Sequence, residues 1–444
     1  MADLLIIVLA AISTVVPLWL GGRYGLVTLV SPMHFLGYFC AAGFFVKVVV
    51  YARNPDWAFY QRYVETPGAD LIGAIYLTGF ILMMCLGYRA AVGGGGPSDT
   101  LPQRRAMAAG LERTHLLFIA SFVIAALTLV LILRARGLSG LTPDLLETLN
   151  RDKQVNVNAA GNGATLAGIK SLFIVPKCAF VMLLAAGLVR KDNVVLGQAV
   201  VIAGLLICVG LVTGDRFELL ELFAYGAITF LLVGGQVRLR SVLVASAFAC
   251  AVLLTSAYMT TLRGSDAGLL HQIVGSTYFL DINAAVMISD RMTPDLFLYG
   301  DSYSWWSFGW FPRAYWPDKP AIDMGVYFKR AVMGLGEGGA FNVTGPGEAY
   351  INFGWAGVCV GFVLGWFYRR IEVCLLSIKP TLRFAGFVYY PLLFYPFLQG
   401  TLQSSFSAFV VGAAAQGILI VFVISLCLPR YRKRTPLNGV VYAH

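Results

Sequence analysis

Charged residues are scarce in this chain. Of its 444 residues only 13% are Asp, Glu, Lys or Arg, whereas an ordinary soluble domain has roughly 25%. Hydrophobic residues make up 58% of the chain, against roughly 45–50% in soluble domains. The composition therefore excludes an ordinary soluble domain and predicts an integral membrane protein.

Metal-binding and hydrolase motifs are missing as well. The histidines are few and stand apart from one another, at positions 34, 115, 271 and 444. The sequence contains no HEXXH, CXXC or GXSXG pattern. Zinc hydrolysis and α/β-hydrolase chemistry are therefore not expected, and we expect no metal site.

Long apolar runs dominate the rest of the chain. A run of about 18 to 22 apolar residues is long enough to cross a bilayer as a helix. Eleven such spans are predicted, near 3–20, 26–48, 69–88, 115–135, 165–189, 194–213, 217–234, 242–259, 349–367, 383–400 and 408–428. We therefore expect an all-α polytopic membrane protein, with a single transmembrane domain over residues 1–444. One large loop, 260–348, separates the eighth span from the ninth.

The net charge of +10 is unevenly distributed among the connections between these spans. Every second connection is net positive, and those between them are neutral or slightly acidic. The positive ones lie at 23, 89–113, 190–191, 238–240, 369–383 and 430–434. The positive-inside rule places them in the cytoplasm, so the N-terminus and the 260–348 loop face outward and the C-terminus faces inward. The basic excess is thus a topology signal with affinity for anionic membrane lipids, and it requires no nucleic acid.

A charged turn follows the sixth predicted span. Asp215 and Arg216 lie at this outward turn, and Glu218 and Glu221 follow three residues apart on one face of the next helix. These residues predict a small ionic cluster at the outer membrane edge. The planar donors of Arg216 match the oxygens of a phosphate or pyrophosphate.

Lys177 lies about twelve residues inside the fifth predicted span. An ionised amine is costly at such a depth unless it is paired or hydrated, so it indicates a functional cavity. The alternative is that the helix starts later and that Pro176 interrupts it, which would expose Lys177. Both interpretations stay open.

The 260–348 loop has a mixed charge and many aromatic residues. Six basic and nine acidic side chains accompany the tryptophans, a composition that suits a carbohydrate site. Carboxylates would bind sugar hydroxyls and aromatic faces would pack on sugar C–H surfaces, although tryptophans also gather at membrane interfaces as anchors. Pro312, Pro317 and Pro320 fix φ and stiffen the backbone around Arg313 and Lys319.

Three segments of the chain carry a family resemblance. They are Gly214-Asp215-Arg216 at an outward turn, FPRAYWPDKP at 311–320 and GPGEAYINFGWAGV at 345–358. The second is similar to a P-R-x-x-W-P-x-K-P segment and the third to a G-E-x-Y-x-N-F-G-x-x-G segment. Together they resemble the oligosaccharide repeat-unit polymerases of bacterial envelopes, the Wzy-type O-antigen polymerases.

The resemblance implies a GT-C-like glycosyltransferase of the bacterial inner membrane, whose outward side is periplasmic. Such an enzyme moves a growing glycan from undecaprenyl diphosphate to a new lipid-linked repeat unit of O-antigen or a related surface polysaccharide. It needs no cofactor, because the diphosphate linkage of the donor already stores the energy. The implied partners are the lipid-linked oligosaccharide, membrane lipids, a chain-length regulator and a flippase.

The same resemblance suggests roles for individual residues. Cations stabilise the leaving diphosphate, and a carboxylate takes the proton of the attacking hydroxyl. The catalytic candidates are Arg216, Arg263 and Arg313 as cations and Glu348 as the base. Asp281, Asp301 and Asp318 are alternative bases, and Glu348 has a structural alternative as a favourable charge at a helix start. The substrate-binding candidates are Asp215, Lys177, Lys319, Trp316, Tyr350 and Asn352.

Two other functions fit part of this pattern. An O-antigen ligase would pass the same donor to lipid A-core, and a transporter would flip a lipid-linked glycan past the same cations. The segments at 311–320 and 345–358 favour the polymerase over the ligase. The polar residues gather on one side of the predicted membrane, which favours chemistry at the outer leaflet over a transport path at the midplane.

Overall fold

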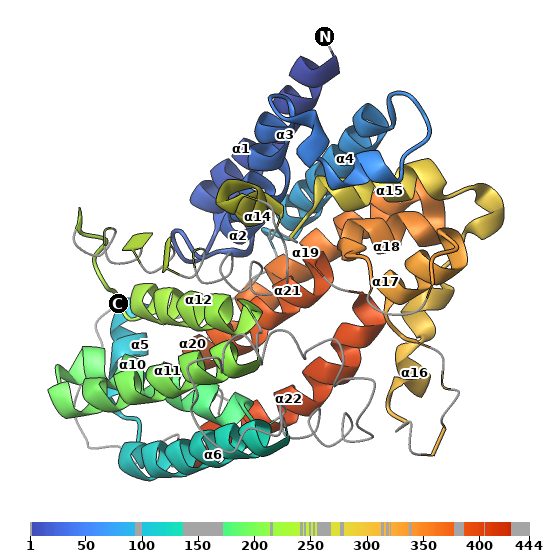
Figure 1. Ribbon diagram of the computed structural model, residues 1–444. Coiled ribbons are helices and arrows are strands. Elements are labelled where there is room, and N and C mark those ends of the chain that lie inside the picture. The colour runs from blue at the N-terminus through green and yellow to red at the C-terminus, as the bar shows by residue number, and fades with distance from the viewer. Residues whose placement is uncertain are drawn as a thin grey trace.

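The computed structural model consists of helices and their connections in the part of the chain that it describes (Figure 1). That part covers 2–93, 100–135, 172–213, 216–239, 268–275, 279–311, 321–336, 340–376, 386–403 and 405–427, together with single positions in 243–254 and Tyr315, Trp316 and Lys319. Within it no strand is found. The prediction of an all-α fold is therefore confirmed.

Among the described residues, eight helices are long and continuous. They are α1 (Ala2–Tyr24), α4 (Ala69–Ala90), α6 (Thr114–Ala135), α10 (Ile174–Arg190), α11 (Asn193–Thr213), α12 (Arg216–Leu232), α19 (Val358–Leu375) and α22 (Phe406–Cys427). Two further helical stretches are assembled from pieces with a π-helical turn in the middle. The first is α2 (Pro32–Cys40), η1 (Ala41–Phe45) and α3 (Val46–Tyr51), and the second is α20 (Gly386–Tyr389), η8 (Tyr390–Phe394) and α21 (Tyr395–Leu402).

The remaining elements are short. They are the helices α5 (Leu101–Ala109), α14 (Leu269–Gly275), α15 (Ile282–Arg291), α16 (Trp306–Gly309), α17 (Met324–Tyr327) and α18 (Thr344–Phe353), the 3₁₀ turns η2 (Pro55–Trp57), η3 (Phe59–Arg62), η4 (Pro294–Leu296), η5 (Asp301–Ser304) and η7 (Gly354–Gly357), and the π-helical turn η6 (Phe328–Val332). Most of them belong to the segment that was predicted as one large loop. That segment therefore contains several helical turns, and its last residues already form α18.

Seven helical stretches are long and apolar enough to cross a membrane, judged by length and composition in the described residues. They are Asp3–Tyr24, Pro32–Tyr51, Ala69–Ala90, Thr114–Leu131, Asn193–Leu211, Thr344–Leu375 and Phe406–Cys427. The helices α10 and α12 have 17 residues each, and the predicted span at 242–259 lies mostly outside the described residues. A multi-pass membrane protein is thus supported, whereas the number of eleven spans stays a prediction.

The helices form two groups that the C-terminal helices connect (Figure 1). In the first group α4 packs against α1, α15 and α19, and α1 packs against α2. In the second group α10 packs against α6, α11, α12 and α22. The pieces η8 and α21 contact α12, α18, α19 and α22, so they join the two groups.

Close backbone approach explains the contact between α4 and α19. A Cβ atom on Gly87 would lie 1.9 Å from the carbonyl oxygen of Phe362, and one on Gly365 would lie 1.9 Å from that of Met84. Only glycine allows two helix backbones to approach this closely. Such small-residue contacts are typical of helix packing in membranes.

A second glycine interrupts the ninth predicted span. Gly354 has φ 56° and ψ −134°, a conformation that other residues rarely adopt, and the ring of Phe297 occupies the space where its Cβ would lie. The helix therefore ends at Phe353 and resumes as α19. The predicted continuous helix at 349–367 is in fact two helices with a 3₁₀ turn between them.

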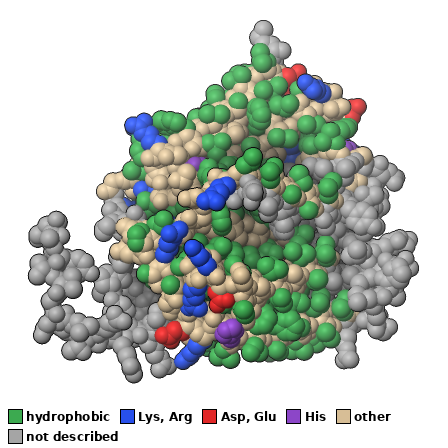
Figure 2. Space-filling model, turned by 90° about the vertical axis from the view of Figure 1, so that its left-hand side faces the viewer, with side chains coloured by type: hydrophobic (Ala, Val, Ile, Leu, Met, Phe, Trp, Pro, Cys, Tyr) green, Lys and Arg blue, Asp and Glu red, His purple; other side chains and the backbone are tan. Residues whose placement is uncertain are grey.

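The basic connections meet at one end of the molecule. Arg190 donates to the carbonyl oxygen of Ala109, Arg105 to that of Val233, and Arg369 to that of Tyr24. Figure 2 shows lysine and arginine side chains on one face, among many apolar ones. This clustering agrees with the alternation of charge on which the predicted topology rests. We call this the basic end, and the end at which α1, α4 and α12 begin the loop end.

The loop segment has an apolar core of its own. Met287 and Ile288 of α15, Met324 of α17 and Phe328 are buried together with Tyr350. Tyr76 of α4 belongs to the same cluster, so the segment is packed onto the helices at the loop end. The chain around Glu348 is thereby held in place.

Candidate functional site

Glu348 lies at the meeting point of three segments at the loop end. Its side chain belongs to α18 and only 1% of the residue is exposed. The hydroxyl of Ser302 in η5 donates to Oε1 at 2.8 Å, and the backbone amide of Phe406, the first residue of α22, donates to Oε2 at 2.7 Å. Both carboxylate oxygens are therefore hydrogen-bonded in this arrangement.

Asn352 joins the same cluster from the next turn of α18. Its Nδ2 donates to Ser302 Oγ and to the carbonyl oxygen of Glu348, each at 2.8 Å, and its Oδ1 accepts from the amide of Gly300 at 2.9 Å. The i, i+4 spacing of Glu348 and Asn352 puts both on one face of α18. Two predicted site residues are thus brought together, with Ser302 between them.

Tyr350 lies on a different face of α18. Its ring packs edge-to-face against Tyr76 at 4.7 Å between centroids and against Phe297 at 6.2 Å. Tyr350 is 6% exposed and belongs to the apolar cluster of the loop segment. Tyr350, which was predicted to bind substrate, therefore packs α18 against the apolar core of the loop segment and does not face the polar cluster.

Unusual backbone conformations flank this cluster. Thr344, the first residue of α18, has φ 63°, and Tyr299, which precedes Gly300, has φ 47°. A positive φ is rare for a residue other than glycine and exceptional for a β-branched one. Strained residues of this kind concentrate at functional sites, where the surrounding structure holds them in place.

The second motif segment is described in part. Lys319 Nζ donates to the carbonyl oxygens of Gly309 at 2.8 Å and Phe311 at 2.9 Å. Trp316 is 40% exposed, and its ring lies edge-on to that of Phe308 at 6.0 Å. Lys319 and Trp316 therefore both contact the end of α16 or the residues next to it, and backbone carbonyls hold the Lys319 ammonium.

Three predicted residues lie outside the described part of the chain, namely Asp215, Arg263 and Arg313. Arg216 is the first residue of α12, and its side chain also lies outside the described part. So does the alternative base Asp318. The arrangement of the predicted catalytic cations thus stays a prediction.

Lys177 combines elements of both interpretations given above. In the described residues its helix begins at Ile174, later than predicted, and Lys177 lies in the first turn, directly after Pro176. It is nevertheless buried, because Glu218 and Glu221 of α12 hold its ammonium at 2.7 Å and 2.5 Å. Glu218 and Glu221 thus form an ionic cluster with Lys177, whereas the side chains of Asp215 and Arg216, the other members of the predicted cluster, lie outside the described part of the chain.

Two alternative bases have partners of their own. Asp281 caps the start of α15, where its Oδ1 accepts from the amide of Asn283 and from Lys47 Nζ, each at 2.9 Å. Asp301 accepts a hydrogen bond from the indole of Trp305 at 3.1 Å. Lys47 is fully buried and was not expected from the sequence, because it lies within an apolar run and its partner is far along the chain.

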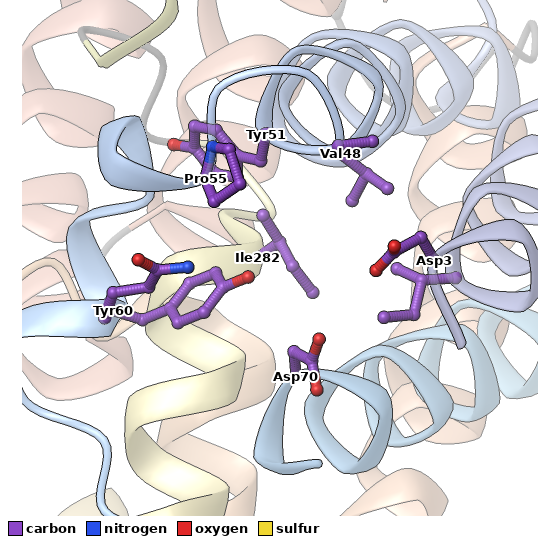
Figure 3. Close-up of a pocket in the computed structure, with 10 residues that line it drawn as sticks. Asp3, Val48, Tyr51, Pro55, Tyr60, Asp70 and Ile282 are labelled. Atoms are coloured by element: carbon purple, nitrogen blue, oxygen red, sulfur yellow. The ribbon is translucent and has the colours of Figure 1, made fainter. Parts of the chain in front are cut away.

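A small pocket opens at the loop end between the starts of α1 and α4 (Figure 3). Its volume is about 110 Å³, and its polar lining residues are Asp3, Tyr51, Tyr60, Gln61 and Asp70. Burial, followed by the carboxylates of Asp70 and Asp3, raises the pKa of Tyr60 to about 12. The pocket is acidic and lies apart from Glu348, which does not line it.

No group of three or more potential metal ligands occurs among the residues that the structure describes. Comparison of the chain with protein-family models, with curated proteins and with solved structures gives no match. The polymerase activity implied by the motifs is therefore developed below as a proposal.

Proposed function

We propose that this protein is a glycosyltransferase that polymerises undecaprenyl-diphosphate-linked oligosaccharide repeat units at the periplasmic face of the bacterial inner membrane. The observation that supports it most is the cluster around Glu348. The glutamate and the asparagine of the G-E-x-Y-x-N-F-G segment share Ser302, and they lie between α18, η5 and α22. The polar residues of the motif thus converge on one carboxylate.

Glu348 is the base of the proposed reaction. The acceptor hydroxyl attacks C1 of the donor sugar, the bond from C1 to the diphosphate oxygen breaks, and the hydroxyl proton passes to the carboxylate. Because Oε2 accepts from the Phe406 amide, this contact opens when the acceptor enters. The remaining bond from Ser302 to Oε1 keeps the carboxylate oriented.

Cations act on the other product of the proposed reaction. The leaving undecaprenyl diphosphate carries spread negative charge, which preorganised arginines stabilise in a site that excludes water. We assign this role to Arg216, Arg263 and Arg313. Lys319 acts as a positioning residue, because it binds the carbonyl oxygens of Gly309 and Phe311, which precede Arg313 in the chain. Lys177 is left out of the diphosphate site, because two carboxylates already neutralise it.

The proposal is tested with purified protein in lipid vesicles that receive lipid-linked repeat units alone. We expect a ladder of longer glycans and the release of one undecaprenyl diphosphate for each bond formed. A product that appears only after lipid A-core is added would show a ligase instead. Label that crosses the bilayer without a new glycosidic bond would show a transporter.

Variants of the predicted cations refine this experiment. Arg216→Ala and Arg313→Ala are expected to abolish the ladder while the protein is still made and folded. Arg62→Ala is the matched control, because Arg62 is an exposed arginine at the same end of the molecule. Full activity in either of the first two variants would remove that arginine from the site.

A further inference from the structure

Four buried hydroxyl groups have no hydrogen-bond partner within the described part of the chain, one of them that of Ser121 in α6. The other three belong to Tyr225 and Thr229 of α12 and to Tyr395 of α21, and each of these residues is 1% exposed. Buried polar groups in native proteins are almost always hydrogen-bonded, either to protein or to ordered water. Three unpaired hydroxyls in one region therefore indicate a missing ligand that hydrogen-bonds.

Two of these three residues are in ring contact, and the third lies one helical turn away. The rings of Tyr225 and Tyr395 meet edge-to-face at 6.0 Å between centroids. Thr229 follows Tyr225 by one turn on the same face of α12, and Glu221 precedes Tyr225 by one turn. A polar line thus extends from Glu218 to Thr229, roughly 16 Å along the helix axis.

This line begins at the loop end with the cluster of Lys177, Glu218 and Glu221. The side chains of these residues are 10%, 25% and 15% exposed, so the cluster is partly open at its surface. Three ionised groups inside a helix bundle are costly unless they are hydrated or paired. Water next to Glu221 would lower this cost.

The other end of the line is closed. Ile228 and Leu232 are fully buried, and Arg105 donates to the carbonyl oxygens of Val233 at 2.9 Å and Gly234 at 3.3 Å. These contacts seal the last turn of α12 at the basic end. The polar line is therefore open toward the loop end only.

We propose that Tyr225, Thr229 and Tyr395 line a dead-end site for bound water, which opens at the Lys177 cluster and hydrates Glu221 inside the bundle. Water fits because a hydroxyl both donates and accepts, and a buried water needs two to four polar partners. The bound water continues the hydration of Glu221 from the loop end into the bundle. This inference does not depend on the proposed glycosyltransferase activity.

The first test is thermal unfolding of Tyr225→Phe, Tyr395→Phe and Thr229→Val in lipid nanodiscs, without any substrate. If water binds the hydroxyls, each variant loses hydrogen bonds and its Tm falls by roughly 2 °C or more. Tyr390→Phe is the matched control, because Tyr390 is equally buried and its hydroxyl donates to the carbonyl oxygen of Val30 at 2.9 Å. If the Tm of the three variants is unchanged or higher while that of the control falls, the three hydroxyls make no hydrogen bond to water, and the proposal is overturned.

The second test measures water access directly. Thr229→Cys and Ile228→Cys proteins in sealed vesicles receive a small methanethiosulfonate, and mass spectrometry follows the modification of each peptide. We expect Cys at position 229 to react roughly tenfold faster than at 228, and from one side of the membrane only, because a water-soluble reagent does not reach a dry thiol. Equal rates at the two positions, or equal access from both sides, would contradict a one-sided hydrated site.

Discussion

The carboxylate of Glu348 and the backbone amide of Phe406 lie 2.7 Å apart, although 58 residues separate them along the chain. This bond joins α18 to the start of α22, and the Ser302 hydroxyl holds the other carboxylate oxygen. One side chain thus connects three segments at the loop end. Its replacement tests structure and chemistry together.

Glu348→Gln separates the two roles. Glutamine has the same size and can still accept from the Phe406 amide, but it cannot take a proton from an acceptor hydroxyl. We expect the rate of polymer formation to fall by roughly 10²- to 10⁴-fold, with little change in Tm. The measurement is the initial rate of ladder formation beside a thermal unfolding curve. A Gln variant with the wild-type rate would leave Glu348 a purely structural role.

Ser302→Ala tests how much the cluster contributes to stability. The substitution leaves Glu348 Oε1 and one Asn352 Nδ2 proton without their partner inside the protein, at a cost of about 1–3 kcal/mol for each buried group. Ser304→Ala is the control, because Ser304 is exposed and its hydroxyl donates to the carbonyl oxygen of Asp301 in its own turn. Thermal unfolding in detergent should show a larger loss for Ser302→Ala, and equal losses would contradict the cluster's contribution.

Lys47→Met is expected to destabilise the protein strongly. The substitution removes the cation from a buried ion pair, and the carboxylate of Asp281 loses its charged partner, which costs about 3–5 kcal/mol. The double variant Lys47→Met with Asp281→Asn should recover part of this loss, since asparagine is neutral and can still cap α15. A double variant no more stable than Lys47→Met would argue against a charge effect.

Gly354→Ala tests the break between α18 and α19. Alanine is strained at the φ and ψ of this residue, and its Cβ would lie 2.6 Å from the ring of Phe297. We expect a loss of about 1–3 kcal/mol in unfolding free energy, measured by thermal unfolding. Gly197→Ala in α11 is the control: it has open space and an ordinary helical backbone, so it should stabilise the protein by up to about 1 kcal/mol.

Hydropathy was a good guide to the long helices. The predicted spans at 69–88, 115–135, 194–213 and 408–428 correspond closely to α4, α6, α11 and α22, because the length of an apolar run is itself the requirement for crossing a bilayer. The division of the ninth span was missed. Gly354 lies in an otherwise apolar helical pattern, and the need for its special conformation arises from Phe297, which is distant along the chain.

The candidate site was predictable only where its residues share a motif. Glu348 and Asn352 lie one turn apart, so sequence spacing alone puts them on one helix face. Ser302 and the Phe406 amide come from other elements, and no local sequence pattern predicts that either of them contacts Glu348. The partners of Lys177 could not be predicted either. An ionised amine within an apolar run needs pairing or hydration, but only the fold shows that Glu218 and Glu221 provide the pairing.

The turn at Gly354 also has a consequence for depth in a bilayer. The apolar stretch Thr344–Leu375 has 32 residues, whereas about 20 are enough to cross a membrane. The residues of α19 before Arg369 at the basic end, 358–368, extend only about 16 Å, roughly half of the 30 Å or so of the hydrocarbon core. A crossing of the bilayer by this stretch therefore needs part of α18 as well, and the turn at Gly354 lies within the crossing.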